Sequence, residues 1–277
     1  MWFNYFLSST AAVRLAALIS VALNLSACGT KEEPGAANTC EDLAQVTTPP
    51  AAGSLCSFDA QDFPTLTEAC TIGVANPTRL ALTTTDYSTG AVSVVDLATR
   101  TVQKDVALAG SDALVGYHAG SIYVLNRNND NYVDLLDGSG FQSQGSEYPI
   151  RIECSTNPNP HSITFTKEGY ALLPNYGHAS ASLMDFSQDP AAAIIHNFDL
   201  NQFADADGNA EASLSFRCGD IAFVSVQRLD GNFTPVDCDL LVPIDLAQKK
   251  VYASAIPING RWLKQIRKDP SDAKGHT

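Results

Sequence analysis

Short apolar runs that end in polar residues recur along residues 79–258 of this chain. Four of the runs end in a polar pair, and these pairs are Asp86-Tyr87, Asn126-Arg127, Asn175-Tyr176 and Gln227-Arg228. Each pair is followed by a second apolar run that ends in an aspartate: Asp96, Asp137, Asp185 or Asp245. Successive pairs lie 40, 49 and 52 residues apart. The sequence therefore predicts four copies of one unit.

Each unit has room for four short strands. In the run before Asp96, Val92 and Val94 share one face because side chains alternate along a strand. Further strands are expected at Thr101–Leu108, Tyr148–Ile152, Ala191–Phe198 and Lys250–Ile256, and before a unit at His161–Thr166. Gly120, Gly169 and Gly219 stand at the turn before the second strand, where a positive φ suits glycine. The body shows no clean helical period of about 3.6 residues, so helices are not expected there.

A repeat of this length with four strands is typical of a β-propeller blade. One four-stranded sheet cannot bury both of its faces, so each copy has to pack on the next. The predicted fold class is all-β: a propeller of four-stranded antiparallel blades, about four in number. Trp262–Lys268 is one more strand candidate before the last residue given, Thr277. We therefore expect the start of a fifth blade in an incomplete, C-terminally truncated ring, with a short basic helix as the alternative for this segment.

Three stretches resemble a known family, the YVTN β-propeller repeat proteins. Tyr123-Val124-Leu125-Asn126 is similar to the namesake motif, residues 89–102 to the strand-Asp-turn-strand stretch, and Asn159-Pro160-His161-Ser162-Ile163 to the Pro-His segment that opens a blade. The resemblance covers roughly residues 75–277 and is specific for fold. It implies an envelope or surface protein related to lactonase-type and quinoprotein-type propellers. The fourth unit departs from the pattern, because eight extra residues precede Asp245.

The first 28 residues have the features of an export signal. Arg14 precedes an apolar run from Leu15 to Leu25, which is too short to span a bilayer. The run ends in Leu25-Ser26-Ala27-Cys28-Gly29, which resembles the lipobox of bacterial lipoproteins and makes Cys28 the acylated residue. An ordinary signal peptide is the alternative. The resulting division is a signal peptide over 1–27, an acylated tether over 28–39, a Cys-bearing segment over 40–74 and the propeller over 75–277.

The remaining cysteines fit the same compartment. They are six in number: Cys40, Cys56, Cys70, Cys154, Cys218 and Cys238. An even number in an exported protein predicts three disulfides, in any of 15 pairings. The first three are expected to staple the segment 40–70. Zinc is the weaker alternative, because the sequence has no C-x-x-C motif or compact Cys/His cluster.

Composition and charge exclude several classes of protein. The 30 Asp and Glu outnumber the 17 Lys and Arg, for a net charge of -13. A chain this acidic is a poor partner for nucleic acid, and no apolar run is long enough for a polytopic membrane protein. With 45% hydrophobic residues the chain can form a core. No G-x-S-x-G, H-E-x-x-H, Walker, G-x-G-x-x-G or C-x-x-C-H motif occurs.

The polar pairs are the best candidates for a binding site. Equivalent positions in successive blades converge on one face near the central channel. The predicted ligand ring consists of Asn126, Arg127, Asn175, Tyr176, His178, Gln227 and Arg228. The alternative interpretation is structural: these side chains satisfy turn backbone groups and stack between blades.

Two metal hypotheses remain. Asp205, Asp207, Asn209 and Glu211 place four oxygen donors within seven residues, which suits calcium, although the spacing is not that of an EF-hand. A solvated acidic loop is the alternative. His161 and His178 lie 17 residues apart and suggest copper or acid–base chemistry, or else simple structural hydrogen bonding. No other cofactor is expected.

The function predicted from these features is that of a non-catalytic lipoprotein of the outer membrane. It would be held by the acylated Cys28 and would bind a protein, a glycan or another envelope component through its propeller. Gly29 after the acylated cysteine, by resemblance, permits outer-membrane sorting. An enzyme of the lactonase or quinoprotein type and a purely structural envelope part are the alternatives. No nucleic-acid partner is expected.

Overall fold

The computed structural model describes residues 55, 60–71 and 78–258, which all belong to the second of the chain's two units, Cys40–Thr277. Secondary structure in these ranges is almost entirely β. The helical turns described are three short 3-10 turns: η1 (Ala60–Asp62), η2 (Pro190–Ala192) and η3 (Asn201–Phe203). None of the described helices is long and apolar enough to cross a membrane.

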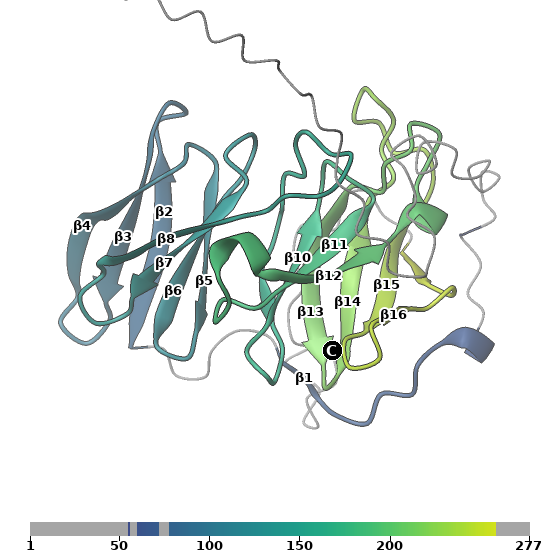
Figure 1. Ribbon diagram of the computed structural model, residues 1–277, viewed down its shortest axis with the longest axis horizontal. Helices are drawn as coiled ribbons and strands as arrows, with labels where there is room; N and C mark the ends of the chain where they lie inside the picture. The colour runs from purple at the N-terminus through teal and green to yellow at the C-terminus, as the bar shows by residue number, and fades with distance from the viewer. Residues whose placement is uncertain (1–54, 56–59, 72–77, 259–277) are drawn as a thin grey trace, which may run out of the picture. The chain divides into compact units, whose positions relative to one another are not determined.

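Four antiparallel sheets follow one another in chain order (Figure 1). The first sheet contains β2 (Arg79–Thr85), β3 (Gly90–Asp96) and β4 (Thr101–Ala109). The second contains β5 (Ala113–His118), β6 (Ser121–Asn126), β7 (Tyr132–Asp137) and β8 (Ser143–Pro149). The third contains β9 (Thr164–Phe165), β10 (Ala171–Asn175), β11 (Ser180–Met184) and β12 (Ile194–Asp199). The fourth contains β13 (Ala212–Cys218), β14 (Ile221–Val226), β15 (Asp239–Asp245), β16 (Lys250–Val251) and β17 (Ile256–Ile258), joined at one edge by β1 (Cys70–Thr71).

Strand alternation explains why the sheets stack. In β6, Val124 packs in a core cluster with Val92 and Val94 of the first sheet, whereas its neighbour Leu125 packs with Leu173 of the third. The same switch occurs at β10, where Leu172 packs toward the fourth sheet. Each inner sheet is therefore apolar on both faces and buries both against its neighbours, as blades do.

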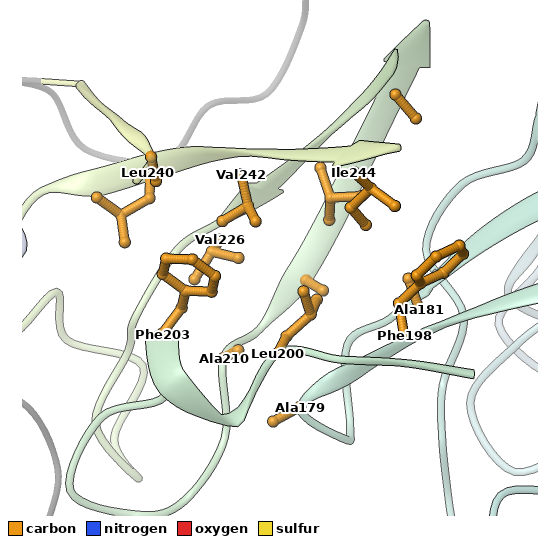
Figure 2. Close-up of a cluster of buried hydrophobic side chains, with 14 of the residues drawn as sticks. Ala179, Ala181, Phe198, Leu200, Phe203, Ala210, Val226, Leu240, Val242 and Ile244 are labelled. Carbon is orange, nitrogen blue, oxygen red and sulfur yellow. The ribbon is translucent and has the colours of Figure 1, made fainter. Parts of the chain in front are cut away.

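The largest of these clusters lies between the third and fourth sheets. Figure 2 shows Ala181 and Phe198 of the third sheet facing Val242 and Ile244 of the fourth. Phe203, which follows β12 in η3, is fully buried in the same cluster. The all-β prediction, with several four-stranded antiparallel sheets, is thus confirmed.

The recurring aspartates have a structural cause. Asp96 Oδ1 accepts hydrogen bonds from the backbone N–H groups of Ala98 and Thr99, at 3.0 and 2.8 Å. Asp137 accepts from Ser139 and Gly140 in the same way. Such turns end a strand and begin the return to the next, which explains why an aspartate ends the second apolar run of each unit.

Several predicted strand limits were wrong. The strand expected at 148–152 is β8, which ends at Pro149 and begins at Ser143. The segment 191–198 opens with η2 before β12, and 250–256 divides into β16 and β17. Of residues 161–166 only Thr164 and Phe165 form a strand. The first sheet has three strands among the described residues instead of four. Trp262–Lys268, the signal peptide and the tether lie outside the described residues.

Candidate functional site

Polar side chains gather where β6, β10 and β14 end. The register places the residues before each sheet's first strand beside these ends: Ala113 pairs with Asn126, Pro160 with Asn175, and Ala212 with Val226. The resulting set, called the polar row below, comprises Asp112, Arg127, His161, Tyr176, Asn209, Glu211, Arg228 and Asp237. Three of these come from the predicted ligand ring, and two from the predicted calcium loop.

The row begins at the second sheet with an ion pair. Arg127 Nη2 lies 2.5 Å from Asp112 Oδ1, and its Nε donates to the Asp112 carbonyl at 3.0 Å. The guanidinium side chain is 16% exposed. Arg127 is therefore held by a protein partner and keeps little surface for a ligand.

The middle of the row is a ring stack on the third sheet. The rings of His161 and Tyr176 are nearly parallel, with centroids 4.0 Å apart. Burial lowers the pKa of His161 to about 4, and the nearby Arg127 charge adds to the effect. His161 is consequently neutral at physiological pH. Burial also raises the pKa of Tyr176, with the Glu211 carboxyl as a second cause.

The far end of the row lies at the fourth sheet. Here residues of the predicted ligand ring and residues of the predicted calcium loop lie together. Asn209 Nδ2 donates to the Tyr176 carbonyl at 2.8 Å. Glu211 is 4% exposed, and its Oε2 accepts from the Leu229 N–H at 2.9 Å. Arg228, 2% exposed, donates from Nη1 to Asp237 Oδ2 at 3.1 Å. A buried arginine thus lies among acidic groups, as buried charges require.

The acidic groups at this end hold their protons unusually well. Burial raises the pKa of Glu211 to about 8, with the Asp205 and Asp207 carboxyls adding to the shift. Burial likewise raises the pKa of Asp205 to about 6, and the Asp207 carboxyl is a second cause. Within the described ranges, no group of three or more His, Cys, Asp or Glu side chains is placed to hold a metal ion.

The remaining ring candidates have structural contacts. Asn126 is 1% exposed and accepts from the Gly110 N–H at 2.6 Å. Asn175 is fully buried and donates to the hydroxyls of Ser180 and Ser182, both at 3.0 Å. Ser180 also lies 3.0 Å from His178 Nδ1, and burial lowers the pKa of His178. Gln227 is buried.

Sequence reasoning missed Asp112 and Asp237, the acidic partners of the two arginines. Each lies shortly before a strand, Asp112 before β5 and Asp237 before β15. A signal existed for Asp112: it immediately precedes the strand that pairs with the strand ending in Asn126. Reading the strands as hairpins would have placed it beside Arg127.

Two pockets lie at opposite ends of the sheets. One, of about 660 Å³, adjoins the loops at the row's end and is lined by Asp130, Tyr132, Glu147 and Arg151 among others. The other, of about 720 Å³, lies between the first two sheets, where Arg79, Tyr117 and Gly138 line it at the end away from the row. Neither pocket is lined by a residue of the polar row.

Cysteine pairing ties the N-terminal segment to the fourth sheet. Cys70 forms a disulfide with Cys218, 148 residues away in sequence. Cys154 and Cys238 are also disulfide-bonded. Disulfide formation, predicted from the even number of cysteines, is thus confirmed for this chain. The expectation that Cys70 helps to staple the segment 40–70 was wrong, because its partner is Cys218 of β13. Cys40 and Cys56 lie outside the described residues.

Comparison with known proteins gives similarity at the level of structure alone. No protein-family profile and no curated protein sequence matches the chain. It is similar to TolB from Acinetobacter baumannii, at 13% identity and a TM-score of 0.45, over 71% of this chain and 44% of that one. It is also similar to dihydro-heme d1 dehydrogenase NirN in complex with DHE (15%, TM-score 0.42, 65% and 37%) and to a chain of a nidogen/laminin complex (13%, TM-score 0.42, 65% and 59%). The chain thus spans less than two thirds of the length of each of these proteins.

Proposed function

We propose that this chain is an envelope-anchored, non-catalytic lipoprotein whose stacked sheets are the blades of a β-propeller that binds a protein, a glycan or another envelope component. The observation that carries the binding role is the 660 Å³ pocket at the loops that follow β6 and β8, which is lined by residues outside the polar row. Its volume is within the range of ligand sites, about 300–1,000 Å³, and its lining mixes charged groups with apolar ones.

The non-catalytic part of the proposal is supported by how the ionisable groups are used. Arg127 and Arg228 each pair with an aspartate, and His161 is neutral and stacked on Tyr176. An acid–base site needs groups that face substrate with pKa values near the working pH. In the row most of these groups face one another.

Anchoring is proposed on the sequence of residues 25–29. Acylation of Cys28 would hold the chain at the outer membrane, because each buried methylene contributes about 0.8 kcal/mol. The Cys28→Ala variant is expected to lose the lipid label and to leave the membrane fraction. If native and variant chains fractionate alike, the anchoring proposal fails.

Binding is tested by a photoreactive amino acid placed in the pocket. Arg151 is exposed and lines the 660 Å³ pocket; Arg100, also exposed, lies in the turn after Asp96 and serves as the matched control. In intact cells we expect a specific adduct with a protein or glycan from position 151 and none from position 100. Equal labelling, or none, would contradict the binding role.

Glu211 favours the enzyme alternative. A carboxyl whose pKa is raised to about 8 could act as a general acid. Hydrolysis of lactones by the native chain that is lost in Glu211→Gln, with the fold intact, would replace the binding proposal.

A further inference from the structure

Charge is distributed unequally between the two ends of the sheets. At the end where the polar row lies, called the row end below, seven connections carry nine Asp and Glu against three Arg; they are 86–89, 110–112, 127–131, 150–163, 176–179, 200–211 and 227–238. At the opposite end, seven connections carry four Asp and Glu against three Lys and Arg; they are 97–100, 119–120, 138–142, 166–170, 185–193, 219–220 and 246–249. Glu211 is protonated at neutral pH because its pKa is about 8, but the excess of negative charge at the row end remains.

Two of the three arginines at the row end are already paired with aspartates. Arg127 pairs with Asp112, and the buried Arg228 donates to Asp237. When both pairs are set aside, seven carboxyl groups of the row end face one remaining guanidinium, that of Arg151. The row end therefore attracts positively charged molecules more strongly than the opposite end does.

The 660 Å³ pocket lies at this acidic end. Its lining includes the carboxyl groups of Asp130 and Glu147 and the half-buried side chain of Tyr132. Burial raises the pKa of Tyr132, and the carboxyls of Glu147, Asp130 and Asp134 raise it further, so three carboxyls lie near the phenol. Surroundings that disfavour a phenolate favour a cation at the same place. In the ranges that the structure describes, no ion pair includes Asp130 or Glu147.

Hydrogen bonds hold the walls of this pocket in place. Asn131 Oδ1 accepts from the Asn159 N–H at 3.0 Å, and its Nδ2 donates to Asn157 Oδ1 at 3.0 Å. The Asn131 carbonyl accepts from the Ile150 N–H at 2.8 Å. The connections that follow β6 and β8 are thus joined beside the pocket, where Ile150 and Ile152 supply apolar lining. A site that is held in this way loses little freedom when it binds a ligand.

We propose that this pocket receives a lysine or arginine side chain of a basic protein segment, whose further positive charges meet the acidic connections of the row end. The inference rests on the proposed binding function and names the chemistry of its partner. The charged head pairs with Asp130 and Glu147 and lies beside the ring of Tyr132, where ion pairing and cation–π attraction act together. The methylene stem packs on the apolar lining of the pocket. A neutral glycan would gain nothing from the excess of carboxylates, so the charge favours a protein.

Binding of a fluorescent hexalysine peptide to the full-length chain tests the class of partner. We expect hexalysine to bind with an affinity that falls steeply between about 0.05 and 0.5 M salt, because salt screens the charges. The double variant Asp130→Asn, Glu147→Gln should bind it roughly tenfold more weakly, since both carboxylates of the pocket are lost. The matched double variant Asp105→Asn, Glu168→Gln removes the same charge from exposed positions away from the row end and should change the affinity less than about twofold. No binding of hexalysine, or equal weakening in the two double variants, would overturn the proposal.

The exposed Arg151 supplies a variant with the opposite sign. It lines the pocket and competes there with an incoming cation, so Arg151→Gln should bind hexalysine roughly threefold more tightly than the native chain does. Hexaglutamate and the neutral glycan chitohexaose are the comparison probes. If either of them binds the native chain more tightly than hexalysine does, the basic partner is wrong.

The adduct expected from position 151 in intact cells separates this inference from the binding role itself. A crosslinked protein segment rich in Lys and Arg supports both. An adduct with a glycan, or with a protein segment that has no excess of Lys and Arg, overturns the inference and leaves the binding role in place. The absence of a specific adduct overturns both.

Discussion

The first and fourth sheets each have one face that no neighbouring described sheet covers, and the chain treats the two faces differently. On the fourth sheet, Phe216 and Phe223 are stacked and only 8% and 3% exposed, with Phe63 packed against them. On the first sheet, Leu82 is 41% and Leu108 85% exposed. The first and fourth sheets thus stand at the two ends of the series, but only the outer face of the fourth sheet is covered.

The difference lies in the segment 60–71, which crosses the fourth sheet. Its Asp62 accepts from the Ala253 N–H at 2.8 Å, its Phe63 packs on Phe223, and its Cys70 is bonded to β13. A terminal sheet must find a cover for its apolar face or leave it in water, where it invites association. The chain uses its own N-terminal segment to cover one end.

The largest expected effect comes from removing the aromatic ring at the covered face. Phe223→Ala should lower the free energy of unfolding by about 3–5 kcal/mol, because a buried ring is lost and a cavity remains. The matched change at the exposed face, Leu82→Ala, should cost less than about 1 kcal/mol, since much of that side chain is already in water. Urea unfolding of both variants measures the difference. Equal losses would mean that the two faces are covered to the same extent.

The next effect comes from releasing the covering segment. The double variant Cys70→Ala, Cys218→Ala should lose about 2–5 kcal/mol, because the disulfide closes a loop of 148 residues. Hydrogen exchange should locate the loss: amides of β13 and β14 are expected to exchange faster, while those of β3 do not change. Faster exchange confined to the first sheet would contradict the assignment of this segment to the fourth.

The two terminal sheets also show which features of the fold can be predicted from the sequence and which cannot. The recurring aspartates and turn glycines were sufficient to predict the repeat, because Asx turns and positive φ are local properties; Gly120, Gly169 and Gly219 do have φ of 88°, 89° and 65°. The cover of the fourth sheet could not be predicted, since nothing near Phe63 or Cys70 encodes a partner some 150 residues away. β8 was misplaced for a different reason: an outer strand needs few apolar residues, and Ser143–Glu147 has none.

The residues of the candidate site likewise divide into those that the sequence repeat could place and those that it could not. That Arg127, Tyr176 and Arg228 would lie at one end of the sheets followed from the repeat alone. Their partners did not, because Asp112 and Asp237 come from loops that vary in length between units. The acidic loop at 205–211 was interpreted either as a calcium site or as a solvated loop. The contact of its Asn209 with Tyr176, and the influence of Glu211 on the pKa of Tyr176, did not follow from either interpretation.

The third prediction compares how two carboxyl groups, Glu211 near the fourth sheet and Asp86 of the first, make stability depend on pH. The expected change in the free energy of unfolding is smaller than that for the loss of an aromatic ring. The folded-state pKa of Glu211 is raised from 4.5 to about 8, so its favourable contribution is complete below about pH 4.5 and is lost as pH rises to about 8. Glu211→Gln should therefore match the native chain at pH 4.5 and exceed its stability at pH 8.5, by on the order of 2 kcal/mol after allowance for screening. Urea unfolding across this range measures the change.

Asp86, in the turn after β2, is the matched control with the opposite sign. The N–H groups of Thr89 and Ser88 lower its pKa, so it stabilises the fold above its unfolded value of 3.8, and that contribution is lost as pH falls through the lower folded value. Asp86→Asn should thus be less stable than the native chain at neutral pH and indistinguishable from it in strong acid. Parallel pH profiles for the Glu211 and Asp86 variants would show that the fourth-sheet carboxyl is not buried differently from the turn carboxyl of the first.

The smallest expected effect tests whether ion pairs or apolar packing hold the segment 60–71 on the fourth sheet. Lys167 contacts Glu68 of the covering segment and lies 3.2 Å from Asp220, but its side chain is 37% exposed, and exposed ion pairs contribute little. Lys167→Ala should shift the urea midpoint far less than Phe223→Ala, and the shift should vanish in about 1 M salt, where charges are screened beyond about 3 Å. Arg79→Ala, which breaks the exposed pair with Asp96 on the first sheet, should behave in the same way. A loss for Lys167→Ala that approaches that of Phe223→Ala in low salt and disappears in high salt would mean that ion pairs hold the segment, and apolar burial would no longer explain why one end of the series is covered.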